Sequence, residues 1–297
     1  MTAPQGVIPA LLTPADSAGR VDHGALGHLV ERVVERGVSG ISPLGSTGEG
    51  YSLSLEQRLG VLDTVANLVP AGMPVIAGVF AHNPELAVAE IAAYADHGAT
   101  AALLTPPSYY PLAAAEQLEH FSRIVDLTAL PVVLYNIPVF SKIVLAPAVV
   151  VRLAAHQQVI GLKDSSRDLG YGTEVLDTVA AAGVHEFSVL TGTDSMLVEY
   201  MLAGAQGTIC ANANIVPELV GAVYEAVRAG KIDEAGQHQK RLRAVQAAFR
   251  TGASPAAYKA ATAALGIGGP WLIPPRLPLE ESLRAQLVER LTALEVL

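Results

Sequence analysis

The sequence has little cysteine, little charge and no long apolar run. Cys210 is the only cysteine in 297 residues, which excludes a disulfide within the chain and a metal cluster built on cysteine. Charged residues make up 16% of the chain and leave a net charge of -9, so nucleic acid and anionic membrane surfaces are not expected as partners. Apolar stretches such as 130–140 are too short to span a bilayer, and the first residues lack the features of a signal peptide. We expect a soluble, cytoplasmic protein.

Apolar residues, in contrast, make up 51% of the sequence, which is enough for a sizeable core. Short apolar segments recur with helical patterns between them, and each segment is typical of a buried strand. Strand–helix alternation of this kind indicates a parallel sheet covered by helices. We therefore predict an α/β fold, a closed (β/α)8 TIM barrel with a C-terminal helical extension. The eight predicted strands lie within 6–12, 38–44, 74–80, 100–105, 131–135, 159–163, 187–190 and 207–211.

The stretches between these segments carry helix signals. Ser54 and Gln57 fit a capping box, and Pro84 fits a first-turn proline. The chief competing fold is an open doubly wound sheet, but no Gly-x-Gly-x-x-Gly follows the first strand to support a dinucleotide site. Helices are predicted over 22–37, from 54 onward, and over 84–98, 113–128, 147–155, 173–182 and 195–203.

Beyond the eighth strand the pattern is helical throughout. Helices are predicted over 216–230, 232–250, 256–265 and 283–294, with a connection rich in Gly and Pro at 266–278. We predict a catalytic barrel over 1–214 and a helical extension over 215–297 that packs on it.

The predicted strand 159–163 ends in a single lysine, Lys163, and breaks into Asp164, Ser165 and Ser166. Burial disfavours the charged form of an amine, and a neutral amine forms a Schiff base with a carbonyl group. The alternative is a strand-end lysine whose ammonium group extends to solvent. Of the five lysines, only Lys163 ends a predicted strand, which favours the catalytic interpretation.

Other candidate residues also follow predicted strands, where a barrel places its active site. Ser46 and Thr47 lie in a glycine-rich turn whose N–H and hydroxyl groups suit a carboxylate, although an ordinary turn that caps a helix is an alternative. Tyr135 shares a strand face with Val133; it is either a proton relay or a core tyrosine. Tyr109 lies in an aromatic loop between prolines, which is also typical of a subunit interface. The histidines lack metal-ligand spacing, so no metal site is predicted.

Taken together, four stretches resemble the dihydrodipicolinate synthase / N-acetylneuraminate lyase family. The resemblance covers nearly the whole chain in order and spacing. The two most specific signals are the Gly-Ser-Thr-Gly-Glu turn and the strand-end lysine. The four stretches are 45–49, 105–111, 135–138 and 161–164.

The resemblance implies a barrel, usually tetrameric, in which a lysine forms a Schiff base with pyruvate or another 2-oxo acid. Lys163 is then the nucleophile, Tyr135 the proton donor and acceptor, and Thr47 a further catalytic residue. The protonated imine is an electron sink while a carbon–carbon bond is made or broken, so neither a metal nor an organic cofactor is expected. Tyr109 would replace, with a one-residue shift, the family's tyrosine that crosses from a neighbouring subunit, because Ser108 aligns there without gaps.

The same resemblance implies the substrate contacts. The turn residues Ser46, Thr47 and Gly48 would bind the pyruvate carboxylate, and the carbonyl group of Ile209 would make a further contact with pyruvate. The expected specificity residues are mainly small or polar side chains without an arginine cluster, which suits a non-phosphorylated polyhydroxy aldehyde. They are Phe140, Ser165, Ser166, Thr193, Asp194, Ala211 and Asn212.

One departure from the family bears on the substrate. Dihydrodipicolinate synthases carry an arginine after their Tyr-Asn-x-Pro motif that pairs with the second substrate's carboxylate, whereas Phe140 stands there in this chain and cannot form such a pair. Sialate lyases carry an acidic pair where this chain has Asp194 and Ser195, which argues against sialate. Lys142 is a partial substitute for the arginine, as a point charge.

We therefore expect a pyruvate-dependent aldolase or lyase that acts on a 2-keto-3-deoxy sugar acid or a related 2-oxo acid, with an aldehyde as the partner substrate. The alternatives are a true dihydrodipicolinate synthase that uses aspartate semialdehyde, a dehydratase that uses the same imine, and a non-catalytic paralogue that binds a 2-oxo acid. By family analogy we expect a homotetramer or homodimer.

Overall fold

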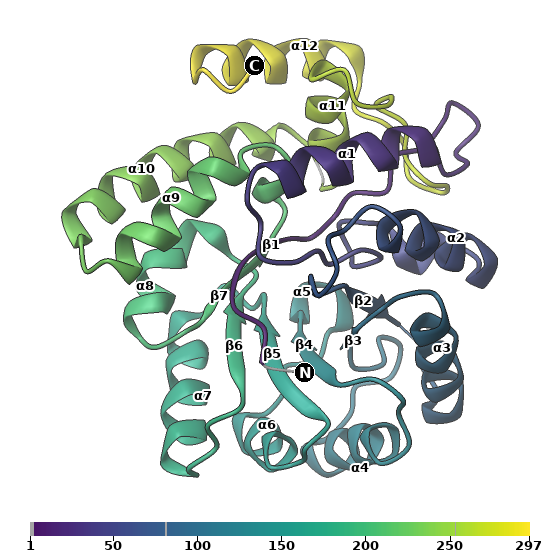
Figure 1. Cartoon of the computed structure of the whole chain (residues 1–297), viewed down its shortest axis with the longest axis vertical. Helices are drawn as coiled ribbons and strands as arrows, with labels where there is room; N and C mark the ends of the chain where they lie inside the picture. Colours follow the sequence, from purple (N-terminus) through teal and green to yellow (C-terminus); the bar gives the residue numbers. More distant parts are fainter. Residues whose placement is uncertain (1–2, 81, 253) are drawn as a thin grey trace.

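The centre of the molecule is one curled sheet of seven parallel strands, in the order β1-β7-β6-β5-β4-β3-β2 (Figure 1). The computed structural model describes residues 3–80, 82–252 and 254–297. Every strand residue is buried, as expected for a parallel sheet covered on its outer face. The strands are β1 (Gly6–Pro9), β2 (Ile76–Val79), β3 (Ala101–Leu104), β4 (Val132–Asn136), β5 (Val159–Asp164), β6 (Ser188–Thr191) and β7 (Gly207–Cys210).

Seven of the eight predicted strands are present, and the prediction for 38–44 is wrong. Only two residues of this segment pair, because Pro43 has no N–H to donate and Leu44 adopts a left-handed conformation with φ 62°. These two residues nevertheless bond to both edges of the sheet, so the segment lies between β1 and β2 and the fold is TIM-barrel-like. Isolated parallel bridges join Ala10 to Ser42 and Ile41 to Val75.

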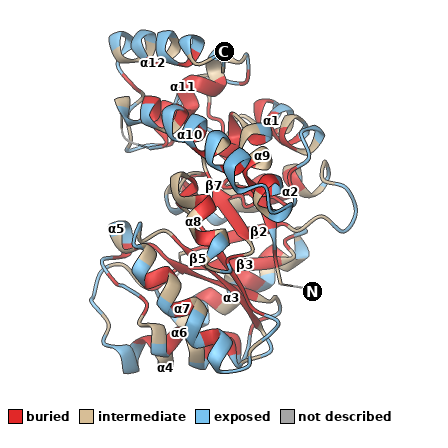
Figure 2. Ribbon diagram, turned by 90° about the vertical axis from the view of Figure 1, so that its left-hand side faces the viewer, coloured by how far each residue is buried: buried red, intermediate tan, exposed pale blue. Residues whose placement is uncertain are grey.

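Helices cover the outer face of the sheet and leave their own outer faces exposed (Figure 2). The capping box of Ser54 and Gln57 is confirmed at the start of α2, and Pro84 occupies the first turn of α3. These helices are α1 (His23–Glu35), α2 (Leu55–Ala66), α3 (Pro84–Asp96), α4 (Ala114–Val125), α6 (Pro147–Ala154), α7 (Leu169–Ala181) and α8 (Leu197–Leu202).

Two short elements differ from the predictions. A 3₁₀ turn over Asp194–Met196 precedes α8, so the predicted helix over 195–203 is α-helical only in its second part. The helix α5 (Pro138–Ser141) was not predicted, because four residues are too few to show a helical period. This helix directly follows β4 and carries Phe140 to the carboxyl-terminal end of the sheet.

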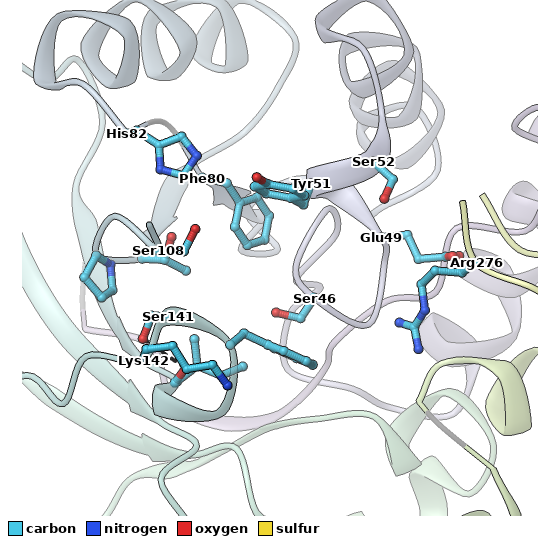
Figure 3. Close-up of a pocket in the computed structure, with 14 residues that line it drawn as sticks. Ser46, Glu49, Tyr51, Ser52, Phe80, His82, Ser108, Ser141, Lys142 and Arg276 are labelled. Carbon is cyan, nitrogen blue, oxygen red and sulfur yellow. Dashed lines mark hydrogen bonds between the residues drawn. The ribbon is translucent and has the colours of Figure 1, made fainter. Parts of the chain in front are cut away.

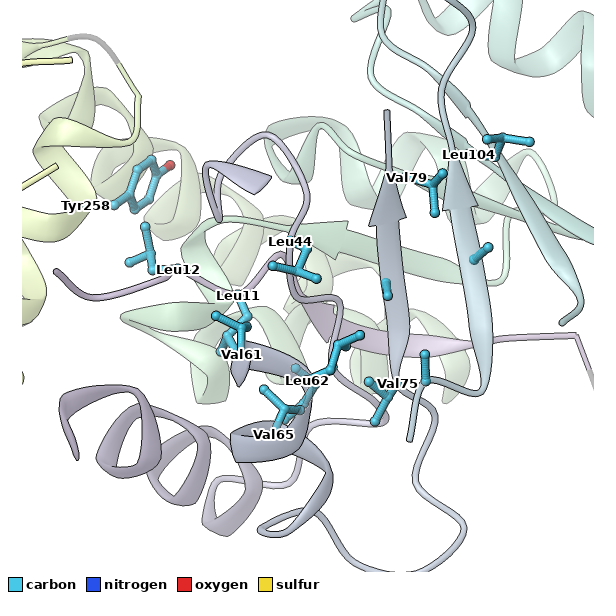
Figure 4. Packing of buried hydrophobic residues seen from close by; sticks show 14 of the residues in the cluster. Leu11, Leu12, Leu44, Val61, Leu62, Val65, Val75, Val79, Leu104 and Tyr258 are labelled. Atoms are coloured by element: carbon cyan, nitrogen blue, oxygen red, sulfur yellow. The ribbon is translucent and has the colours of Figure 1, made fainter. Parts of the chain in front are cut away.

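Four helices follow the last strand, as predicted: α9 (Pro217–Arg228), α10 (Ile232–Ala248), α11 (Ala256–Ala264) and α12 (Glu281–Ala293). α9 packs on β1, where Val220 and Val223 share an apolar cluster with Val7. Tyr258 of α11 belongs to the main core cluster with Leu12 (Figure 4), and its ring stacks on that of Phe249 at 4.1 Å. No helix among the described residues is both long and apolar enough to cross a membrane.

Alternate residues of the seven strands form a separate apolar cluster, typical of the packed interior of a barrel. Tyr135 belongs to this cluster together with Val133, so the expected sharing of one strand face is confirmed and that face is internal. The other members include Ile8, Ile76, Leu103, Leu190 and Ile209.

Candidate active site

Lys163 and Tyr135 lie side by side at the carboxyl-terminal ends of β5 and β4. The two residues are register partners, and the Lys163 ammonium nitrogen lies 4.3 Å from the centre of the Tyr135 ring. Both side chains are nearly inaccessible, at 4% and 3% exposure. A basic nitrogen and a phenol are thus held together in a poorly solvated site, which is the arrangement needed for imine chemistry with proton transfer.

A β-bulge sets this pairing. Val132 pairs with Val159, but its neighbour Val133 pairs with Gly161, so β5 contains one extra residue at this point. If the register of Val132 and Val159 continued without a bulge, Leu162 would lie opposite Tyr135, and Lys163 would lie on the other face of the sheet. Gly161 permits the close approach of the strands, because a Cβ atom there would lie 2.6 Å from the carbonyl oxygen of Ser188.

The surroundings of Lys163 leave its amine without a counter-charge. Among the carboxylates that the structure describes, none lies within the 4.0 Å of its Nζ that would make an ion pair. Gly192, from the next strand end, gives its stem room, because a Cβ atom there would lie 3.2 Å from Lys163 Cε and 1.9 Å from Ser165 Oγ. The lysine therefore has space to move and no ion pair to break when a carbonyl group arrives.

The residue after the lysine fixes the strand ends. The Asp164 carboxylate is buried and accepts hydrogen bonds from Asn136 Nδ2 at 2.8 Å, from the Ser166 hydroxyl at 2.9 Å and from the Tyr200 hydroxyl at 2.6 Å. Burial, strengthened by the bond to Asp164, raises the pKa of Tyr200, so this phenol stays a donor. Asn136 and Asp164 directly follow Tyr135 and Lys163, so this network fixes the strand ends from which those two side chains extend.

The turn that carries Ser46 and Thr47 is tightly constrained. It lies between two residues with left-handed backbone, Leu44 with φ 62° and Glu49 with φ 54°. The Thr13 hydroxyl donates to the Gly48 carbonyl at 2.7 Å. Non-glycine residues in this conformation are uncommon and are found where surrounding contacts enforce them, often at functional sites.

A buried ion pair holds the end of this turn. The Glu49 carboxylate contacts Lys259 Nζ of α11, and both side chains are only 1% exposed. The Ile273 N–H also donates to Glu49 Oε1 at 3.1 Å. Burial lowers the pKa of Lys259, and the charge of Glu49 opposes that shift. Residues after the last strand therefore set the conformation of a turn near the start of the chain.

These elements surround a cavity of about 380 Å³, called here the reaction cavity. It is walled by strand ends on one side and by residues of α10, α11 and the following connection on the other. Predicted site residues that line it are Ser46, Thr47, Tyr135, Phe140, Lys163, Ser165, Thr193, Asp194, Ile209 and Ala211. The structure thus brings together ten of the residues that the sequence suggested, from five separate segments of the chain: 46–47, 135–140, 163–165, 193–194 and 209–211.

Two residues predicted to act in the site, Gly48 and Tyr109, do not line this cavity. The Gly48 carbonyl is bonded to Thr13. Tyr109 is 82% exposed, packs edge-on against Tyr110 with ring centres 5.0 Å apart, and lines a different hollow. Gly48 therefore supports the turn through its backbone, and Tyr109 lies outside the reaction cavity of this chain.

Two predicted specificity residues also lie outside the lining. The Ser166 hydroxyl bonds to Asp164, and Asn212 Oδ1 accepts from the Tyr258 hydroxyl at 3.2 Å. Asn212 thus supports Tyr258, which lines the cavity, and Ser166 belongs to the network of Asp164.

Sequence reasoning missed several polar residues that line the reaction cavity: Arg167, Gln246, Ser254, Tyr258 and Arg276. Four of them lie after the last strand and at no strand end, so their positions gave no reason to select them. Arg167 directly follows Ser166, and its position after β5 was a sufficient signal to predict it as a site residue. The Gln246 amide donates to Asp194 Oδ1 at 2.9 Å, and burial raises the pKa of Asp194.

Comparisons with known proteins agree with this geometry. Residues 3–294 match the model of the dihydrodipicolinate synthetase family. The chain is 33% identical over 293 residues to a 4-hydroxy-tetrahydrodipicolinate synthase of Acidiphilium cryptum, an alignment that covers 98% of this chain and 99% of the relative.

Two solved structures, each described as a complex with pyruvate, align over 99% of both chains. The prophage protein YagE of E. coli K12 is 28% identical with a TM-score of 0.92, and the dihydrodipicolinate synthase of Acinetobacter baumannii is 30% identical with a TM-score of 0.93. Enzymes of this family form a Schiff base between a lysine and pyruvate and use no external cofactor. The chain belongs to the dihydrodipicolinate synthetase family and is a lyase of the class I aldolase type.

Proposed function

We propose that the protein is a pyruvate-dependent aldolase or lyase that makes or breaks a carbon–carbon bond in a 2-keto-3-deoxy sugar acid or a related 2-oxo acid. The observation that carries this proposal is the pair of Lys163 and Tyr135, in register on neighbouring strands and 4.3 Å apart from nitrogen to ring centre. The pair lines a cavity together with Ser46 and Thr47.

In the first half of the reaction, the turn residues Ser46 and Thr47 bind the carboxylate of pyruvate through hydroxyl and N–H groups. The Lys163 amine attacks the C2 carbonyl carbon. The carbonyl oxygen takes up two protons, one that the amine gives up and one from solvent, and leaves as water. The Tyr135 phenol relays these protons to the departing oxygen. A protonated imine on Lys163 results.

In the second half, the imine withdraws electrons from the neighbouring carbon. Loss of a proton from the pyruvate methyl group gives an enamine, whose carbon attacks an aldehyde while the aldehyde oxygen gains a proton. Water then releases the product from Lys163, and cleavage follows the same steps in reverse. The hydroxyl groups of Ser165 and Thr193, both on the cavity wall, suit a polyhydroxy aldehyde.

Borohydride reduction in the presence of pyruvate tests the proposal. We expect a stable adduct of pyruvate mass on a peptide that contains Lys163 and none in Lys163→Ala. Lys240→Ala, which removes an exposed lysine of α10, is the matched control and should trap normally. A folded protein that gives no adduct, or an adduct on another lysine, would contradict the proposed role of Lys163.

A second candidate, 4-hydroxy-tetrahydrodipicolinate synthase, is favoured by the names of the curated relatives. Against it stands Phe140, which lines the reaction cavity where those synthases carry an arginine, so the carboxylate of aspartate semialdehyde has no partner at that position. An assay that couples pyruvate and aspartate semialdehyde to a dihydrodipicolinate reductase separates the two candidates. We expect weak or no activity, and efficient turnover would favour the synthase.

We also propose that the chain assembles as a homotetramer or homodimer through the loop of Tyr109 and Tyr110. These rings are 82% and 71% exposed and lie side by side, and paired exposed aromatic rings are typical of an interface. Sedimentation velocity should show an oligomer that dissociates in Tyr109→Ser/Tyr110→Ser. A monomeric wild-type protein would contradict this assembly.

A further inference from the structure

A second cavity of about 410 Å³ lies beside the reaction cavity and is called here the side chamber. Its far wall is largely aromatic and includes Tyr51 and Phe80, whose ring centres are 6.0 Å apart. The lining residues common to both cavities are Ser46, Ile137, Phe140 and Arg276. If a substrate longer than pyruvate is attached to Lys163, its far end can lie at this shared boundary.

Arg276 is the one charged residue, among those described, that lines both cavities. Figure 3 shows its side chain extending from the C-terminal connection toward the chamber that Ser46 also lines. The guanidinium group is half-buried, and its Nη2 donates to the Ser254 carbonyl. One bond of this kind fixes the side chain and leaves most of its five N–H donors for a ligand.

The nearby carboxylates do not neutralise this guanidinium. Glu49 also lines the side chamber, but its carboxylate is paired with Lys259 and accepts the Ile273 N–H. Asp194 in the reaction cavity accepts from Gln246. Within the part of the chain that the structure describes, no carboxylate lies within the 4.0 Å of Arg276 that would make an ion pair.

Phe140 lies on the same boundary and offers only a ring, so Arg276 is the group placed there to recognise an anion. A planar guanidinium fork matches a carboxylate in two parallel hydrogen bonds. Arg167, the other arginine of the reaction cavity, is exposed and does not line the side chamber.

We propose that Arg276 binds a carboxylate at the far end of the substrate, so that the enzyme acts on a 3-deoxy-2-oxo sugar acid with a carboxylate at each end. Ser46 and Thr47 would hold the carboxylate that pyruvate supplies, and Arg276 the one that the aldehyde supplies. This assignment rests on the proposed function, because the distal carboxylate is placed relative to an imine on Lys163.

Two six-carbon 2-oxo acids test the proposal without requiring turnover. 2-Oxoadipate and 2-oxohexanoate have the same chain length, and differ in a terminal carboxylate against a methyl group. In borohydride trapping, we expect half-maximal adduct formation at a concentration about tenfold lower for 2-oxoadipate than for 2-oxohexanoate. A charge-assisted pair with Arg276 would provide an advantage of this size. Equal concentrations in the wild-type protein would overturn the proposal.

Variants of Arg276 and of two other arginines test whether Arg276 causes the preference for 2-oxoadipate. The preference for 2-oxoadipate should fall to about onefold in Arg276→Met and recover in part in Arg276→Lys. It should persist in Arg167→Met and in Arg241→Met, the latter removing an exposed arginine of α10. A preference that survives Arg276→Met, or that disappears in Arg167→Met instead, would contradict the assignment. Pyruvate trapping, measured alongside, separates this failure from failure of the proposed function.

Discussion

The protein contains two buried lysines with opposite surroundings. Lys163 is 4% exposed, lines the reaction cavity beside Tyr135 and has no ion-pair partner among the described carboxylates. Lys259 is 1% exposed, lies in the core and is paired with Glu49. Burial alone therefore does not distinguish the two lysines. The carboxylate partner of Lys259 and the cavity beside Lys163 do.

The difference has a physical basis. An ion pair in a poorly solvated site fixes the side chain, which suits a structural contact between distant segments. An amine beside a phenol, with space around its stem and no carboxylate partner, is free to reach a carbonyl group. Substitutions at Lys163, Lys259, Tyr135 and Asp194 test this difference.

The largest effect is expected for Lys163→Met, which should lower turnover by a factor on the order of 10⁴ or more because it removes the proposed nucleophile. Since no buried carboxylate is left without a partner, the free energy of unfolding should change by less than about 1.5 kcal/mol. Steady-state kinetics measure the loss of turnover, and urea unfolding measures the change in the free energy of unfolding. Retained turnover would contradict the assignment of the nucleophile.

Lys259→Met should mainly lower stability, whereas Lys163→Met should mainly lower turnover. The change at Lys259 leaves the Glu49 carboxylate buried without its cation, which is expected to lower the free energy of unfolding by about 3–5 kcal/mol. Glu49→Gln/Lys259→Met should recover most of this loss, because Gln still has an oxygen for the Ile273 N–H. Urea unfolding of both single variants and the double variant measures the coupling, and purely additive losses would show that the pair does not act as a unit.

Tyr135→Phe should lower turnover by about 10²- to 10⁴-fold, because the ring remains in the apolar cluster while the proton relay is lost. The borohydride adduct on Lys163 should still form, since the lysine is intact. Rapid-quench measurement of adduct formation separates the two steps. An unchanged rate of turnover would assign the proton transfer to another group.

The smallest effect concerns Asp194, whose pKa is raised from 3.8 by burial. A raised pKa means that the unfolded chain loses this proton at a lower pH than the folded protein does. Stability from this group is therefore present below about pH 4 and is lost as pH rises through the folded pKa, by about 1.4 kcal/mol for each pH unit that separates the folded pKa from the unfolded pKa.

Asp194→Asn should accordingly flatten the change of melting temperature with pH above about pH 4. Thermal unfolding of the wild-type protein and the variant at several pH values up to 7 measures the two slopes. Parallel slopes would show that Asp194 does not titrate differently in the folded protein. The absolute melting temperatures are not the readout, because the substitution also alters the bond to Gln246.

Local patterns gave a large part of the fold. Seven strands, the capping box of Ser54 and the helices after the last strand lie where the sequence predicted them. The segment 38–44 was wrongly predicted as a strand, because an apolar run does not reveal that Pro43 and Leu44 stop the pairing. The helix α5 was missed because it is shorter than the period that identifies helices.

The residues of the candidate site also fall into two groups, those that the sequence predicted and those that it did not. Residues at strand ends, such as Lys163 and Ser46, were identified because the position of a strand end is visible in the sequence. Gln246, Tyr258 and Arg276 were not, because each belongs to a segment far along the chain that reaches the cavity only after the helices have packed. The residues next to them in the sequence do not indicate that they contact the reaction cavity.

The order of strands and helices, the starts of several helices and the presence of a strand-end lysine can be read from the sequence alone, because each depends on neighbours within a few residues. That Lys163 faces Tyr135 follows instead from tertiary contacts, through the bulge in β5. Tertiary contacts also decide that Lys259 holds the turn of Glu49 and that Arg276 lines both cavities. These contacts join residues that are distant in the chain, and side-chain packing and strand register settle them together.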